Sequence, residues 1–209
     1  MQANGINEIL LEVRKSYRVL FEYQKRILDL VDYIGKSYNL KYDGGYSKFS
    51  NTSPRNGGGS LDSWAWDWLN MYYYEFHFKN KDILNDKNND TIYFSLFILN
   101  DDGYFQAKNE QNIERTSVSK FVDVEKSKSK LIFVVGKNYW DSWGKNWDDL
   151  NFILKDHDVK QKSENEYMIF KSFSLECFEN EDHAKKSILE FEKLCQEYNI
   201  KINIEPKIQ

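Results

Sequence analysis

An apolar repeat near the start of the chain restricts the fold more than any other feature of the sequence. Between residues 5 and 38, positions separated by alternating steps of four and three residues carry almost only apolar or aromatic side chains. These positions are Ile6, Leu10, Val13, Tyr17, Leu20, Gln24, Ile27, Val31, Ile34 and Tyr38. Such spacing places all of them on one side of an α-helix. The sequence therefore predicts a single long helix over residues 5–38.

A helix of this length exceeds what the chain needs to cover its own core. At a rise of ~1.5 Å per residue it extends roughly 50 Å, more than a compact domain of this size requires. Part of the helix is therefore expected to face a partner, either another protein or a second copy of the chain in a homodimer. The candidate interface residues on the helix are Arg14, Arg18, Leu20, Gln24 and Ile27. A polar residue such as Gln24 within the repeat either sets the register of a partner helix or lies satisfied at the edge of a sheet.

The overall composition is that of an acidic globular protein. Of the 209 residues 41% are hydrophobic, and 33 Asp and Glu against 29 Lys and Arg give a net charge of −4. This balance disfavours a nucleic-acid partner, although a local basic surface stays compatible with one. No apolar run approaches about 18 residues, so no membrane partner is expected. The first residues do not resemble a secretory signal and the chain has 2 cysteines, so we expect a cytoplasmic protein.

Residues 39–63 are expected to form a glycine-rich loop. Loops of this length are usually functional or disordered, and the aromatic residues inside this one favour an ordered excursion. Three consecutive glycines precede Ser60, and Arg55 and Lys48 would bring positive charge to the loop. Backbone N–H groups of glycines can surround an anion, although the sequence lacks a complete phosphate-binding motif. Arg55 and Ser60 are therefore candidate ligand-binding residues, and a plain connection is the alternative interpretation.

An aromatic-rich β-region is expected over residues 64–178. Strands are predicted from Tyr72 to Lys79, Thr91 to Leu99, Tyr104 to Lys108, Leu131 to Val135 and Tyr167 to Phe178. The Asp102-Gly103 pair predicts a hairpin turn between the second and third of these strands. A short helix is expected near residues 143–155, with a surface loop around His157. For the tryptophan-rich residues 64–69, a helical turn and a strand both fit the pattern.

The C-terminal region predicts a second amphipathic helix over residues 180–199. Asn180 is a suitable N-cap, and the two acidic residues that follow it suit the positive end of the helix dipole. The order of helix, strands and helix indicates a single α+β domain over residues 1–209. In this domain an antiparallel sheet of four or five strands packs against the long N-terminal and C-terminal helices.

Three polar residues of one predicted strand are the best candidates for chemistry. Glu75, His77 and Lys79 alternate along the chain, so their side chains point to the same face. A Glu and a His in this arrangement can act as an acid–base pair or share a metal. A metal site needs a third ligand from elsewhere, and the neighbouring strand offers mainly Tyr93 and Ser95. The alternative is a half-exposed strand face with a cross-strand ion pair.

The sequence favours a non-catalytic protein-interaction module over an enzyme. It contains no serine–histidine–acid order, no reactive cysteine setting and no metal-binding motif, and we expect neither a cofactor nor a metal. The overlong helix and the aromatic surplus, of which Trp66 is the candidate for exposure, suit an accessory, toxin-neutralising or defence-related subunit of a bacterium or phage. The alternative function is a small-ligand-binding or enzymatic domain, with a pocket formed by Glu75, His77, Lys79 and the glycine-rich loop.

Overall fold

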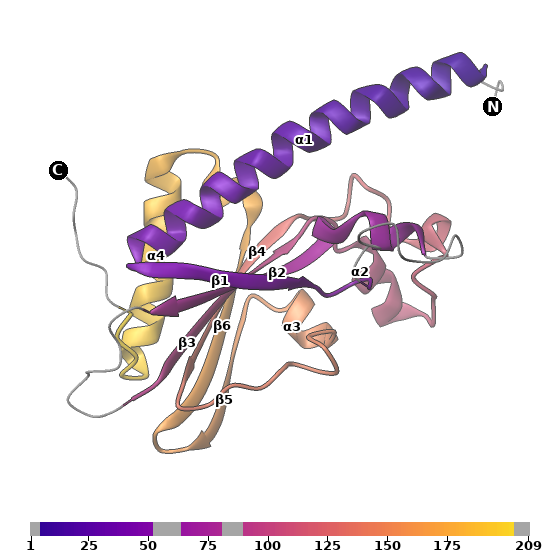
Figure 1. Ribbon diagram of the computed structural model, residues 1–209. Coiled ribbons are helices and arrows are strands. Elements are labelled where there is room, and N and C mark those ends of the chain that lie inside the picture. The colour runs from indigo at the N-terminus through magenta and orange to yellow at the C-terminus, as the bar shows by residue number, and fades with distance from the viewer. Residues whose placement is uncertain (1–4, 52–63, 81–89, 203–209) are drawn as a thin grey trace.

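A six-stranded antiparallel sheet lies at the centre of the part of the chain that the computed structural model describes, which is residues 5–51, 64–80 and 90–202 (Figure 1). Its strand order is β1-β2-β3-β4-β6-β5. The strands are β1 (Leu40–Ser47), β2 (Tyr73–Asn80), β3 (Ile92–Leu99), β4 (Lys130–Lys137), β5 (His157–Ser163) and β6 (Glu166–Ser174). The α-helices are α1 (Ile6–Ser37), α2 (Gly103–Glu110), α3 (Leu150–Leu154) and α4 (Glu181–Glu197).

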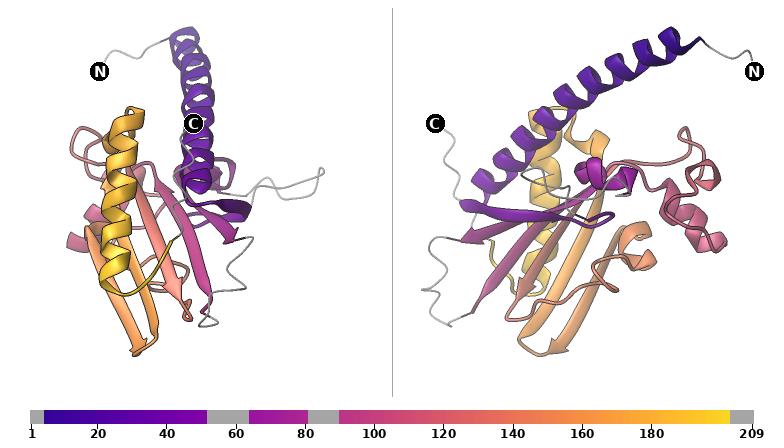
Figure 2. Two further views of the ribbon diagram at one scale, coloured as in Figure 1. Left: turned by 90° about the vertical axis from the view of Figure 1, so that its left-hand side faces the viewer. Right: turned by 45° about the vertical axis from the view of Figure 1, so that its right-hand side comes forward.

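Helices α1 and α4 cover one face of the sheet (Figure 2). The C-terminal part of α1 is buried there from Ile27 onward, together with the inward side chains of the central strands. At the end of α1, the Tyr38 hydroxyl donates a hydrogen bond of 3.1 Å to the backbone oxygen of Ile188 in α4. Gly35 lets the helix approach β2 closely, because a methyl group there would lie 2.5 Å from the ring of Phe78. Among the described helices, none is long and apolar enough to cross a bilayer.

The opposite face of the sheet is covered by α2, α3 and the tryptophan-rich segments. Its buried core includes Phe97 of β3, Ile132 of β4 and Phe152 of α3. The ring of Trp147 lies 4.7 Å from that of Phe97, measured between centroids. β3 and β4 are the central strands of the sheet, and both contribute apolar side chains to both faces.

The predicted fold class is confirmed, with six strands where four or five were expected. The long N-terminal helix begins and ends within a residue of the predicted limits. The C-terminal helix is capped as predicted, since the Asn180 side chain accepts a hydrogen bond of 3.0 Å from the backbone N–H of His183. β3 is buried on both faces along most of its length, as the unbroken apolar run predicts.

The predicted hairpin at Asp102-Gly103 is wrong, because the chain enters α2 at this point instead of a returning strand. The carboxylates before the helix have other partners. Asp101 accepts a hydrogen bond of 2.8 Å from the backbone N–H of Gly103, and Asp102 forms a largely buried ion pair of 3.1 Å with Lys130. Helix α2 also buries Phe105 and its neighbours in the core of this face. The burial of these side chains outweighs the local preference of the Asp-Gly pair for a turn.

The predicted loop over residues 39–63 contains β1, which forms an edge of the sheet beside β2. Gly44 adopts a φ of +130°, and the register of the two strands shifts between Tyr42 and Gly44. This part of the predicted loop is therefore a strand with a bulge at Gly44. The three consecutive glycines lie outside the described residues.

The structure corrects one further prediction and decides one that the sequence left open. His157 is the first residue of β5 and does not lie in a loop. The sequence of this edge strand is polar, so no apolar pattern identifies it as a strand. The tryptophan-rich segment is helical and not a strand. It forms the 3-10 helices η1 (Ala65–Trp68) and η2 (Asn70–Tyr72). The short helix expected near residues 143–155 is confined to α3.

Two substitutions in α1 test whether the repeat has one role or two. Ile34→Ala removes a fully buried side chain and should lower the free energy of unfolding by about 2–5 kcal/mol. Ile6→Ala removes a side chain that is 66% exposed, and it should change the same quantity by less than about 0.5 kcal/mol. Urea denaturation measures both values. Equal losses from the two variants would show that the N-terminal part of α1 is packed against the protein.

Candidate functional site

The N-terminal half of α1 carries the same apolar repeat as the buried half but extends away from the sheet (Figure 1). Its apolar stripe consists of Ile6, Ile9, Leu10, Val13, Tyr17 and Leu20. Of these, Leu20 is half-buried, whereas Ile6 and Tyr17 are 66% and 72% exposed. The stripe covers roughly four helical turns. The described part of the chain thus buries one half of the repeat and leaves the other half in water.

A groove of about 880 Å³ runs along the exposed half of α1. Among the described residues, its lining comes from the helix between Ile9 and Tyr23 and from Leu69 at the end of η1. A cavity of about 260 Å³ shares Leu20, Tyr23 and Leu69 with the groove and continues it toward the sheet. The apolar stripe therefore borders a hollow whose inner end reaches the body of the protein.

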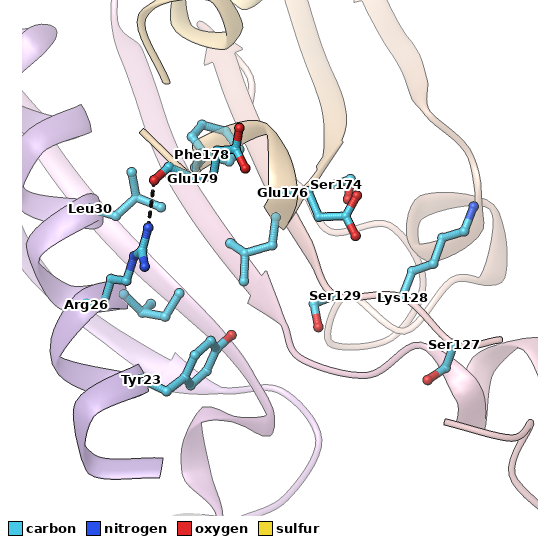
Figure 3. Close-up of a pocket in the computed structure, with 12 residues that line it drawn as sticks. Tyr23, Arg26, Leu30, Ser127, Lys128, Ser129, Ser174, Glu176, Phe178 and Glu179 are labelled. Carbon is cyan, nitrogen blue, oxygen red and sulfur yellow. Dashed lines mark hydrogen bonds between the residues drawn. The ribbon is translucent and has the colours of Figure 1, made fainter. Parts of the chain in front are cut away.

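Another cavity, of about 640 Å³, lies where α1 meets the 3-10 helix η5 (Leu175–Phe178) (Figure 3). Arg26 crosses one side of it and donates a hydrogen bond of 2.7 Å to the backbone oxygen of Glu179. The Tyr23 hydroxyl donates to the Asn100 side chain, and burial raises the pKa of Tyr23 to about 12. The remaining lining mixes serine hydroxyls with side chains of both charge signs. These contacts join α1 to the protein and indicate no particular class of ligand.

The predicted interface residues of α1 fall into three environments. Arg14 and Arg18 are exposed on the projecting half. Leu20 and Gln24 are half-buried and line the cavity that continues the groove. Ile27 is buried against the sheet. The transition from exposed to buried therefore occurs between Leu20 and Ile27.

Trp66 lies inward instead of presenting its ring to solvent. Its indole N–H donates a hydrogen bond of 2.8 Å to the backbone oxygen of Arg115. Its ring packs against Phe49, with the two centroids 5.1 Å apart. The exposed rings of this segment belong to Trp64 and Trp68. Trp66 thus anchors the 3-10 segment that carries Leu69 to the groove.

A buried polar cluster gathers two of the three predicted residues of β2. Glu75 forms an ion pair with Lys48, and both side chains are more than nine-tenths buried. His77 Nε2 lies 3.4 Å from the same carboxylate oxygen, and His77 Nδ1 is within hydrogen-bond distance, 3.0 Å, of Ser95 Oγ. The strand register places Ser95 directly opposite His77. The other oxygen of Glu75, Oε1, has no hydrogen-bond partner among the described residues.

The cluster brings together a hydroxyl, an imidazole and a carboxylate, which are the groups of a serine hydrolase. However, Ser95 is fully buried, so a substrate has no direct access to its hydroxyl. Burial is the main cause that lowers the pKa of His77, and the Lys48 ammonium lowers it further while the Glu75 carboxylate opposes the shift. The geometry therefore suits a neutral histidine that covers a buried ion pair.

The other predicted ligand residues are not part of this cluster in the described structure. Lys79 is exposed and forms an ion pair of 2.6 Å with Asp43. Arg55 and Ser60 lie outside the described residues. None of the three cavities above is lined by Glu75, His77 or Lys79. The described residues contain no group of three or more His, Cys, Asp or Glu side chains arranged to hold a metal.

Leu69 lines the groove opposite α1, but no pattern in the sequence indicates that it belongs to a functional site. It follows the exposed Trp68, precedes the half-buried Tyr72, and is itself 42% exposed. Only the position of α1 across from it shows that Leu69 borders the apolar stripe. A contact between residues so far apart in the sequence follows from the fold and not from any local pattern.

Comparison with known proteins identifies the family. The PM0109 family model matches residues 3–200, so the chain belongs to the PM0109 family. A curated relative, "Uncharacterized protein PM0109" of Pasteurella multocida (strain Pm70), is 43% identical over 42 residues. This match takes in 20% of the chain and 21% of the relative, so the chain covers about a fifth of that protein. No solved structure matches the chain.

The lowered pKa of His77 makes stability depend on pH. The ordinary pKa of 6.5 applies in the unfolded chain, so below about pH 6.5 the unfolded protein binds more protons than the folded one. The free energy of unfolding should therefore decrease between about pH 7 and pH 5. His77→Gln removes the titrating group and should weaken this dependence, as measured by urea denaturation across the range.

The control for losing a histidine is His157→Gln, because His157 is exposed on an edge strand. If the His77→Gln protein kept the full pH dependence of the wild type, the burial of a neutral His77 would be contradicted.

Proposed function

We propose that this protein is a non-catalytic interaction module, an accessory subunit that docks onto another protein in the cytoplasm through the exposed half of α1. The observation that supports this most directly is the apolar stripe. The repeat that buries Ile27, Val31 and Ile34 continues without a break into a half of the helix that nothing in the described structure covers. A surface of this kind is typical of an interaction site.

The free-energy cost of leaving the apolar side of the exposed half in water supports the same conclusion. A helix of about 15 residues without tertiary contacts is marginal in water, because most helical stability in proteins comes from packing an apolar side. The exposed half of α1 avoids the cost of nucleation, since it continues a helix that is already anchored. Its apolar side chains still face water, and a partner that buries them gains roughly 25 cal/mol for each Å² of apolar surface.

A second candidate function rests on the Oε1 of buried Glu75, which has no hydrogen-bond partner among the residues that the structure describes. Buried carboxylate oxygens normally have partners, so an unpaired one is a reason to test for a ligand. The ligand-binding interpretation requires that the glycine-rich loop with Arg55 and Ser60 bring a small molecule to this cluster. A thermal-shift screen of nucleotides and metabolites with wild type and Glu75→Gln tests it, and no stabilisation by any compound would exclude it.

The proposed function predicts that charges in the stripe abolish a specific complex. Tagged wild type and the double variant Val13→Glu/Tyr17→Glu are purified from native cells, and co-purifying proteins are quantified by mass spectrometry. We expect a stoichiometric protein partner with the wild type and at least about a tenfold loss with the variant, because each new carboxylate would have to be desolvated in the interface. Both positions are exposed, so the variant should keep the wild-type stability.

Leu189→Glu is the matched control, since Leu189 is an exposed leucine of α4, away from the stripe. It should retain the partner. Loss of the partner with Leu189→Glu alone, or the absence of any partner with the wild type, would contradict the proposed function.

A further inference from the structure

We propose that Asn100 is the positioning residue of the groove beside the apolar stripe, because its side chain holds the two walls of the groove at a fixed separation. One wall is α1, and the other is Leu69, which lies directly before η2. This inference rests on the proposed function and adds the residue that shapes the docking surface. It follows from the hydrogen bonds of Asn100 and from the space around Tyr23.

Asn100 directly follows β3 and forms hydrogen bonds to three parts of the protein. Its side-chain nitrogen donates to the backbone oxygen of Met71 in η2, and its side-chain oxygen accepts from the Tyr23 hydroxyl of α1. Its backbone N–H donates to the backbone oxygen of Tyr72 at 2.9 Å, and its backbone oxygen accepts from Ser129 Oγ at 2.6 Å. Because β3 is a central strand, Asn100 is held in place independently of α1.

Leu69 and η2 form one unit. The backbone N–H of Tyr72 donates a hydrogen bond of 2.9 Å to the backbone oxygen of Leu69. The backbone oxygen of Tyr72 is the one that accepts from Asn100. A shift of η2 relative to Asn100 would therefore move Leu69 as well.

The chemistry of its two partners determines how the Asn100 amide is oriented. The backbone oxygen of Met71 can only accept a hydrogen bond, so the amide nitrogen of Asn100 faces it. The amide oxygen then faces α1, where it accepts the hydrogen bond of the Tyr23 hydroxyl. Both ends of one planar amide are thus used, one for each wall of the groove.

The space around Tyr23 shows why its hydrogen bond matters for the position of α1. Tyr23 lines the groove and also the cavities of about 640 and 260 Å³. Since protein interiors are close-packed, a helix bordered by cavities of this size has room to tilt. Among the described residues, the hydrogen bonds that join residues 6–26 of α1 to other elements come from Tyr23 and Arg26 alone.

These two hydrogen bonds hold α1 to different parts of the protein. Arg26 reaches across the cavity at η5 to the backbone oxygen of Glu179, and it lines neither the groove nor the smaller cavity (Figure 3). Tyr23 joins α1 to Asn100, the residue that also holds η2. Of the two, only the Tyr23 hydrogen bond therefore connects one wall of the groove to the other.

Two substitutions break the connection at one end each. Tyr23→Phe removes the hydroxyl that holds α1 and keeps the ring. Asn100→Asp keeps an oxygen that accepts from Tyr23 but replaces the N–H donor, so an oxygen would face the Met71 oxygen. The first variant should release α1, and the second should release η2 together with Leu69.

Distances between two spin labels, measured by double electron–electron resonance, report the position of each wall. The labels are attached to pairs of introduced cysteines in a full chain whose two native cysteines are replaced by alanine. Arg14→Cys with Lys193→Cys relates α1 to α4. Arg14→Cys with Val118→Cys relates α1 to the wall at Leu69, because Val118 and Leu69 line the same small cavity. All three labelled positions are exposed.

We expect narrow distance distributions for both label pairs in the parent protein. Tyr23→Phe should shift or broaden both distributions, whereas Asn100→Asp should change only the pair that includes Val118. Tyr42→Phe, which removes the hydroxyl of an exposed tyrosine on β1, is the matched control and should leave both unchanged. A merely structural role of Asn100 would lower the melting temperature without this selectivity between the label pairs.

Unchanged distances in Tyr23→Phe would overturn the inference, and so would broad distributions in the parent protein. An equal change of both label pairs in Asn100→Asp would overturn it as well. Tyr23→Phe removes a single oxygen atom, so it keeps the test decisive even where Asn100→Asp does not fold.

Failure of this inference is distinguishable from failure of the proposed function. The cellular partner should bind Tyr23→Phe about two- to tenfold more weakly, which corresponds to the net contribution of one hydrogen bond. If Val13→Glu/Tyr17→Glu loses the partner while Tyr23→Phe keeps both the distances and the affinity, only the inference fails. If Val13→Glu/Tyr17→Glu keeps every protein contact while the distances respond to Tyr23→Phe, the proposed function fails although Asn100 holds the two walls.

Discussion

Burial of Ile27, Val31 and Ile34 against the sheet is the interaction on which the rest of the structure depends. Fully buried aliphatic side chains contribute about 1.5–3 kcal/mol each, and these three hold α1 across the central strands. The two halves of α1 form one continuous helix and share one axis. The contacts that hold the buried half therefore also determine the direction in which the exposed half projects. The groove beside Leu69 exists because the helix leaves the sheet at this angle.

The parts of the fold that follow from periodicity could be predicted from the sequence. An unbroken apolar spacing identifies α1, and an unbroken apolar run identifies β3 as a central strand. Asn180 marks the start of α4 because its side chain satisfies a free backbone N–H at the helix terminus. In these segments local preference and tertiary packing agree. The exposure of one part of α1 could be inferred as well, since a helix of ~50 Å is longer than a compact domain of this size requires.

The rest depended on contacts between segments distant in sequence. The Asp102-Gly103 pair resembles a hairpin turn, but Asp102 pairs with Lys130 and the following residues pack as a helix. The glycines of β1 signal a loop until their pairing with β2 is known. In the polar cluster, only the register of β2 and β3 shows that Ser95 lies beside His77. The point at which α1 changes from buried to exposed is likewise set by the edge of the sheet.

Amide hydrogen exchange along α1, measured on the isolated protein and on the complex purified from native cells, shows whether the N-terminal half of the helix is exposed until a partner covers it. Residues 27–37 should exchange slowly in both samples, because they are packed against the sheet. Residues 6–20 should exchange rapidly in the isolated protein and become protected in the complex. Slow exchange of residues 6–20 in an isolated monomer, or no change on complex formation, would show that this half of α1 is not a docking surface.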